Sequence, residues 1–146
     1  MNCHPTKNTN STKIPQYLQA FEELPKFLRE NNIKLFSSDD YRKQDIINFY
    51  LEKNNNNEAF NIIDLGEILE QYKKWKLHLP RVTPYYAVKS CPDPMIIKTL
   101  DILGCNFDCA SKGEIISVTD LNIAPERIIY ANPVKDPNYL KFARSQ

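Results

Sequence analysis

Residues 84–110, which read PYYAVKSCPDPMIIKTLDILGCNFDCA, carry the signals of a strand, a helix and a second strand in that order. The first six of them are rich in aromatic and β-branched side chains, which predicts a strand over residues 84–89. The pair Asp93-Pro94 is typical of a helix start, and Gly104 after the apolar run is typical of a helix end. Residues 106–110 then predict the second strand.

The same alternation continues on both sides of this stretch. Upstream, Asp64 and Glu67 have the form of a helix capping box, and downstream Ser111 and Glu114 repeat it. A third predicted strand, residues 127–131, leads into another Asp-Pro helix start. Strands that alternate with helices imply an α/β fold with parallel strands. Two architectures fit this order: an open doubly wound sheet, or about three βα units from the N-terminal part of a (β/α)8 TIM-type barrel.

The N-terminal part of the chain is less regular. We expect residues 1–32 to form a polar, partly disordered lead-in, in which Pro25 interrupts a helical spacing of apolar residues. A helix is predicted over residues 39–51, and a short strand over residues 59–63. Residues 33–146 are expected to form the regular α/β domain.

The composition argues against several classes of function. The chain has 146 residues and a net charge of +1, so no strong field favours nucleic acid or an anionic membrane. No apolar run approaches the roughly 20 residues of a membrane helix, and no secretory signal is visible, so we expect a cytoplasmic protein. The three glycines cannot build a GxGxxG or Walker loop, and the four cysteines include no CxxC pair, so no metal site is expected.

Polar residues stand where the three predicted strands end: Lys89, Asp108 and the pair Asn132-Pro133. In either architecture, chemistry collects at the carboxyl ends of parallel strands. Lys89 follows an apolar strand, and an amine shielded there is available for a Schiff base. The alternative is a lysine that leaves the rim for water with its stem packed on the wall.

Two carboxylates accompany the lysine. Asp108 lies in an apolar strand and needs a cation or hydrogen-bond donors. It could pair with Lys89 across adjacent strand ends, or cap the backbone amides of the next turn. The capping box with Ser111 accounts for Glu114 without catalysis, and an active-site role for Glu114 is the alternative.

Taken together, these segments resemble a known family. Residues 86–91, YAVKSC, look like the pyridoxal-phosphate attachment segment of ornithine decarboxylase and its relatives, the fold-type III decarboxylases of ornithine, lysine and arginine. The segments FDCAS at 107–111 and IIYANP at 128–133 are similar to the ornithine branch. The likeness covers about residues 33–144. One departure is visible, since residues 90–91 are Ser-Cys where the eukaryotic enzymes usually have Cys-Asn.

The resemblance implies a homodimer with a (β/α)8 cofactor barrel and a β-rich second domain, of which this chain holds only the N-terminal barrel portion. It implies pyridoxal 5'-phosphate as the cofactor, joined to Lys89 as the Schiff-base lysine, with Asp108 near both and Glu114 close to the active site. The implied reaction is the decarboxylation of L-ornithine to putrescine in polyamine biosynthesis. An antizyme-type regulator is an implied partner.

Other family elements, such as the glycine-rich phosphate site and the substrate-binding acids, are absent from the sequence. We therefore expect a polypeptide limited to these residues to fold poorly and to lack decarboxylase activity. Two alternatives stay open: a non-catalytic regulatory protein like antizyme inhibitor, or a decayed remnant. Asp108 counts against the former, because those relatives depart from FDCAS at this aspartate. The choice between ornithine, lysine and arginine also stays open.

Overall fold

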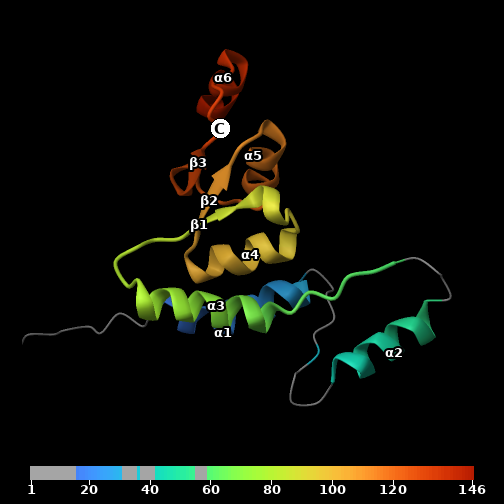
Figure 1. Cartoon of the computed structure of the whole chain (residues 1–146). Helices are drawn as coiled ribbons and strands as arrows, with labels where there is room; N and C mark the ends of the chain where they lie inside the picture. The colour runs from blue at the N-terminus through green and yellow to red at the C-terminus, as the bar shows by residue number, and fades with distance from the viewer. Residues whose placement is uncertain (1–15, 31–35, 37–41, 55–58) are drawn as a thin grey trace, which may run out of the picture.

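Three short parallel strands and the helices between them organise the chain (Figure 1). The computed structural model describes residues 16–30, 36, 42–54 and 59–146. Its elements in chain order are α1 (Gln16–Glu30), α2 (Lys43–Lys53), α3 (Leu65–His78), β1 (Tyr85–Ala87), the 3-10 turn η1 (Val88–Ser90), α4 (Pro94–Leu103), β2 (Asn106–Cys109), α5 (Lys112–Thr119), the 3-10 turn η2 (Pro125–Arg127), β3 (Ile128–Tyr130) and α6 (Pro137–Ser145).

The sheet has the order β1-β2-β3 with every neighbouring pair parallel. This confirms the α/β fold and the three βα units that the sequence predicts. The cap residues are confirmed too: the side chains of Asp64, Asp93, Ser111 and Asp136 each accept a hydrogen bond from a backbone N–H of the helix that follows. Gly104 ends α4 with a φ of 85°, a left-handed conformation that glycine adopts without a steric penalty.

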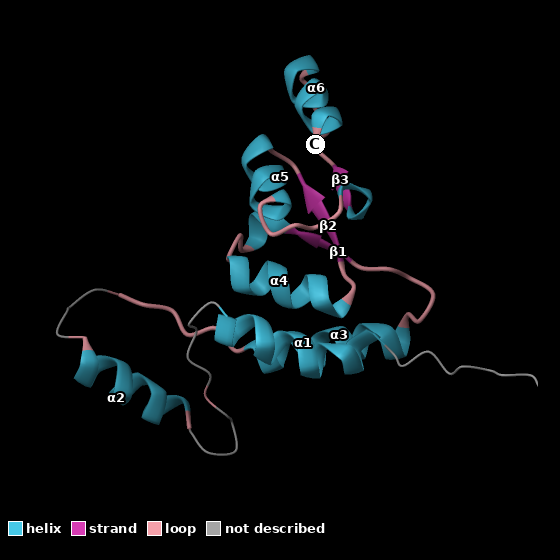
Figure 2. Ribbon diagram, turned by 180° about the vertical axis from the view of Figure 1, so that it is seen from behind, coloured by secondary structure: helices cyan, strands magenta, loops and turns pink. Residues whose placement is uncertain are grey.

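The hydrophobic core lies between the sheet and its covering helices. In β2, Phe107 and Cys109 are fully buried, while the alternate residues are only half-buried. Ile97 of α4 and Val118 of α5 are also fully buried in the same cluster. Figure 2 shows α4 between the sheet and the pair α1 and α3, against which it packs. One face of the sheet is therefore closed by helices, and the other carries the half-buried residues.

The predicted interruption at Pro25 is wrong, because α1 runs through this proline from residue 16 to residue 30. Proline removes one backbone hydrogen bond from a helix interior and costs about 3 kcal/mol. Leu28, one turn further on, is only 1% exposed in a helix that packs on α4. Burial of this face offsets the cost of the proline, and part of the segment 1–32 thereby packs against the α/β units. The domain division at residue 32 stays a prediction.

Two further local predictions need correction. Residues 59–63 form no strand: they pair with none of the three strands and lead into α3 without regular structure. The helix predicted over 39–51 is observed as α2, beginning at Lys43, where the Asp45 carboxylate accepts a hydrogen bond from the Arg42 backbone. Residues 39–41, and residues 1–15 and 31–32 of the lead-in expected over 1–32, lie outside the described residues.

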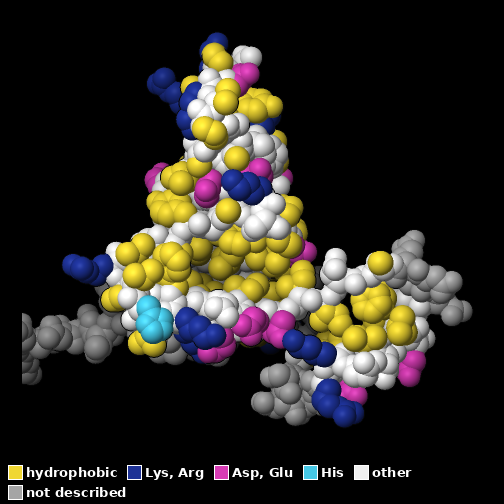
Figure 3. Space-filling view, viewed as in Figure 1, with side chains coloured by type: hydrophobic (Ala, Val, Ile, Leu, Met, Phe, Trp, Pro, Cys, Tyr) yellow, Lys and Arg dark blue, Asp and Glu magenta, His cyan; other side chains and the backbone are white. Residues whose placement is uncertain are grey.

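The surface of the described chain leaves many apolar side chains in contact with solvent. Figure 3 shows them gathered above α3, and Leu77, Val82 and Tyr85 are among the exposed large hydrophobic residues. None of the helices described here is long and apolar enough to cross a membrane. Among the same residues, no group of three or more His, Cys, Asp or Glu side chains is placed to hold a metal ion.

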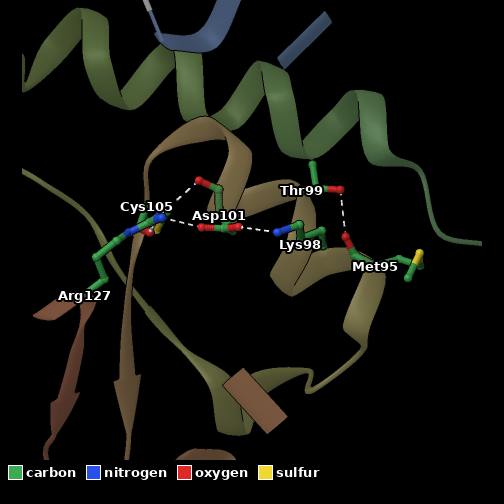
Figure 4. A network of polar contacts seen from close by, with 6 residues as sticks. All are labelled: Met95, Lys98, Thr99, Asp101, Cys105 and Arg127. Carbon is green, nitrogen blue, oxygen red and sulfur yellow. Dashed lines mark hydrogen bonds and ion pairs between the residues drawn. The ribbon is translucent and has the colours of Figure 1, made fainter. Parts of the chain in front are cut away.

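A polar network joins the end of α4 to the turn before β3 (Figure 4). The Asp101 carboxylate accepts hydrogen bonds from the Arg127 guanidinium and, at 2.7 Å, from Lys98 Nζ. Arg127 also donates to the backbone carbonyl of Asp101 in the last turn of α4 and to that of Cys105, just before β2. The side chain of Asp101 is only 12% exposed, so these charge-assisted bonds are little screened by water.

Replacing Asp101 by alanine is expected to lower the free energy of unfolding by about 1–3 kcal/mol, because it leaves the Arg127 guanidinium without its carboxylate partner. Urea denaturation followed by circular dichroism measures the change. The matched control is Glu70→Ala, which breaks the more exposed pair with Lys73 and is expected to cost no more than about 1 kcal/mol. Equal losses in the two variants would contradict the structural role of the network.

Candidate active site

The register of the sheet brings the ends of β1 and β2 to one edge. Ala87, the last residue of β1, is the Cα partner of Asp108, and Lys89 follows two residues later in η1. Successive residues of a strand point to opposite faces, so Ala87 and Asp108 lie on the face opposite the buried Phe107 and Cys109. Two of the predicted site residues therefore belong to the same edge, on or beside the face that the helices leave open.

Lys89 does not lie in apolar surroundings, so the prediction that it closes a buried strand is wrong. Strand β1 ends at Ala87, and Lys89 lies in the 3-10 turn that follows. Val88 fills the core with its side chain and is 0% exposed, and the next side chain in the turn is exposed to solvent. Lys89 Nζ makes no hydrogen bond or ion pair to any residue that the structure describes. The Lys89 side chain is accessible to solvent.

Asp108, in contrast to Lys89, is half-buried, and one of its carboxylate oxygens is inaccessible to solvent. Its Oδ1 is buried without a hydrogen-bond partner. The predicted ion pair with Lys89 is not formed, and neither are the predicted hydrogen bonds to backbone amides of the next turn. A buried carboxylate oxygen without a donor costs free energy, and such groups gather at binding sites because a ligand supplies the missing donor.

Glu114 holds the chain just after β2. Its Oε1 accepts a hydrogen bond from the Ser111 hydroxyl at 3.0 Å, and the Ser111 oxygen accepts from the Glu114 backbone N–H at 3.2 Å. Its Oε2 accepts from the backbone N–H of Ala110 at 2.9 Å. Ser111 caps the helix as predicted, while the Glu114 carboxylate bonds the Ala110 N–H and the Ser111 hydroxyl in place of the Ser111 backbone N–H that a capping box requires. Glu114 thereby fixes the backbone two residues beyond Asp108.

The remaining candidate, Asn132, closes its own turn. Its side-chain oxygen accepts a hydrogen bond from the backbone N–H of Val134 at 3.0 Å. Sequence reasoning missed two other contacts, in which Ser90 Oγ donates to the Ala87 carbonyl and Tyr86 Oη donates to the Cys91 carbonyl. A serine shortly before a proline is a turn signal that could have indicated the first of them. The second depends on packing that no local pattern carries.

A family model described as "Pyridoxal-dependent decarboxylase, pyridoxal binding domain" matches residues 65–146. The chain belongs to this family. The matched residues run from the start of α3 to the end of the chain and include all three strands, so the pyridoxal-dependent decarboxylase signature covers the whole candidate site.

Individual members of the decarboxylase family agree with this assignment. The chain is 42% identical over 140 residues to the probable ornithine decarboxylase of Dictyostelium discoideum, covering 96% of this chain and 30% of that protein. It is 51% identical over 88 residues to the ornithine decarboxylase of Mus pahari, covering 60% of this chain and 19% of that protein. The chain spans less than a third of the length of these relatives.

Solved structures of the decarboxylase family share the fold. The arginine decarboxylase of Paramecium bursaria Chlorella virus matches with a TM-score of 0.66 at 34% identity, covering 69% of this chain and 28% of that one. The ornithine decarboxylase of Entamoeba histolytica matches with a TM-score of 0.63 at 36% identity, covering 68% and 32%. The three βα units are therefore the N-terminal part of the (β/α)8 barrel of these decarboxylases, and the open-sheet alternative is set aside.

Two buried cysteines lie at either end of β2 in this decarboxylase domain. Burial raises the pKa of Cys105 to about 11. Burial, with smaller contributions from the charges of Glu114 and Asp108, raises the pKa of Cys109 to about 12. At neutral pH both thiols therefore stay protonated and serve as small apolar side chains. They are unreactive in this form, because the thiolate is the reactive species.

Iodoacetamide at a pH of about 8 is expected to label Cys91, which is half-buried, at least about tenfold faster than Cys105 or Cys109. Peptide mass spectrometry measures the rates, and labelling in urea, where burial is lost, serves as the control. Rapid labelling of Cys109 in the folded protein would contradict its burial.

The raised pKa values also make the free energy of unfolding depend on pH. An unfolded cysteine has a pKa of about 8.5, below the folded values, so the stabilisation from the neutral thiols is complete below about pH 8.5 and is lost as the pH rises toward 12.

Proposed function

We propose that the protein decarboxylates L-ornithine to putrescine with pyridoxal phosphate joined covalently to Lys89. The observation that carries the proposal is that two different groups lie at the same edge of the sheet. One is the exposed amine of Lys89 in η1, and the other is the buried Oδ1 of Asp108, which has no hydrogen-bond donor. An aldehyde cofactor that also carries a protonated nitrogen or hydroxyl group suits both. Pyridoxal phosphate is such a molecule, so the residues present fit it.

Each residue has a separate task in this proposal. Lys89 would hold the cofactor through its amine, and the same amine, when free, could move a proton. Asp108 would accept a hydrogen bond from a donor group of the cofactor, which would satisfy its buried Oδ1. Glu114 keeps the backbone after β2 in place through its bonds to Ala110 and Ser111. Bound pyridoxal phosphate supplies the electron sink that stabilises the charge left when carbon dioxide departs.

The choice of ornithine rests on the degree of similarity. The curated ornithine decarboxylases of Dictyostelium discoideum and Mus pahari are 42% and 51% identical over the matched residues. The structurally similar arginine decarboxylase and the lysine decarboxylase of Selenomonas ruminantium are 34% and 33% identical. The ornithine decarboxylase of Entamoeba histolytica, compared in the same way as these two structures, is 36% identical, so the argument for ornithine rests on the curated relatives together with the FDCAS and IIYANP segments.

The surroundings of the reaction belong to the same proposal. We propose a cytoplasmic homodimer that is open to an antizyme-type regulator. Among the residues that the structure describes, no strand pairs with the outer edges of β1 and β3, and Tyr85 and Ile129 on the sheet are 44% and 42% exposed. Unpaired edges and apolar exposure disfavour independent folding, so a polypeptide limited to these 146 residues is proposed to be inactive.

Lys89→Ala is expected to abolish covalent attachment of pyridoxal phosphate, because it removes the free amine at the strand edge. The measurement is borohydride reduction of the cofactor-loaded intact protein, followed by peptide mapping of the label. In the unsubstituted protein the label is expected on the peptide that contains Lys89.

The control for nonspecific labelling is Lys74→Ala, which removes an exposed lysine of α3 and should leave the label unchanged. A label that stays at full yield in Lys89→Ala, or that maps to another lysine, would reject the proposed function. Release of labelled carbon dioxide from arginine or lysine but not from ornithine would reject the substrate and leave the attachment intact.

A further inference from the structure

The turn that carries Lys89 is tied down at three points. Val88 anchors its start by filling the core at 0% exposure. Ser90 Oγ donates a hydrogen bond of 2.7 Å to the carbonyl of Ala87, which closes the turn across Lys89. Tyr86 Oη donates a hydrogen bond of 3.0 Å to the carbonyl of Cys91, which ties the end of the turn back to β1. Lys89 is therefore a free side chain on a constrained backbone.

The constraint matters because Lys89 has no partner of its own. A lysine side chain has extensive rotamer freedom, and a reaction at its amine must first overcome the entropy of that freedom. Fixing the backbone of the turn removes part of the cost before any ligand arrives. Ala87, the acceptor of the Ser90 bond, is also the residue in register with Asp108, so the bond sets the lysine turn relative to the carboxylate.

We propose that Ser90 is a positioning residue for Lys89: its hydroxyl closes the turn on the Ala87 carbonyl and holds the lysine backbone in the orientation that covalent capture of an aldehyde cofactor requires. This deepens the proposed function and rests on it. The hydrogen bond from Tyr86 Oη to the Cys91 carbonyl is the second contact that holds the turn, and it comes from β1. The Ser90 hydroxyl donates to the Ala87 carbonyl and not to the Lys89 amine or the Asp108 carboxylate, so the proposed effect passes through the backbone.

The identity of the side chain at position 90 has a chemical consequence. A hydroxyl is a stronger hydrogen-bond donor than a thiol of similar size. Serine at this position therefore gives a firmer closure of the turn than cysteine would. Threonine keeps the hydroxyl, and alanine removes it.

The test compares Ser90→Ala, Ser90→Cys and Ser90→Thr in the intact protein. The dissociation constant for pyridoxal phosphate is measured by absorbance titration, and backbone amide exchange at residues 89–91 is measured without cofactor. Ser90→Ala is expected to weaken binding about three- to tenfold and to speed exchange in the turn by a similar factor. Ser90→Cys is expected to fall between alanine and serine, and Ser90→Thr to bind within about twofold of the unsubstituted protein.

The matched control is Ser117→Ala, which removes a hydroxyl that donates at 2.9 Å to the Gly113 carbonyl of α5, away from the lysine turn. It is expected to change neither the dissociation constant nor the exchange at residues 89–91. Unchanged binding in Ser90→Ala, an equal loss in Ser117→Ala, or no recovery in Ser90→Thr would each overturn the positioning role. An unsubstituted protein that takes up no cofactor would instead reject the proposed function, and this role with it.

Discussion

The parallel pairing of β1 with β2 is the constraint on which the site depends. Because Ala87 lies opposite Asp108, the turn after β1 and the last residues of β2 end at one edge of the sheet. A shift of one residue in this register would move Asp108 to the helix-covered face and bring Phe107 or Cys109 out of the core. The packing of the buried face thus fixes the register of β1 and β2, and this register determines the positions of Lys89 and Asp108.

Stability and chemistry are carried by different residues of the same short elements. Phe107 and Cys109 of β2 are packed in the core, while Asp108 between them holds a carboxylate oxygen without a donor. In η1, Val88 is buried and Lys89 is free. Buried and polar side chains alternate along β2 and η1. The buried ones form the core, and the polar ones, Asp108 and Lys89, lie outside it and make no stabilising contact of their own.

The sequence predicts most of the fold because its signals are local. The Asp-Pro helix starts and the glycine at position 104 act within a turn of the residues they influence, and the structure has them where they were expected. Pro25 misleads because the burial of Leu28 against α4 is a tertiary effect that overrides a local rule. The exposed amine of Lys89 agrees with the alternative that the sequence left open, a lysine that leaves the rim for water, but the sequence could not decide between the two, since the outcome depends on where β1 ends and on which side chain fills the core.

The central claim is that Asp108 lowers the stability of the fold and serves to bind a ligand. Asp108→Asn, measured in the intact protein, tests it most directly. The account predicts that the apo protein keeps or gains thermal stability, because a buried unpaired carboxylate is removed, while affinity for pyridoxal phosphate falls at least about tenfold. A variant that loses stability yet binds the cofactor as tightly as before would contradict the account.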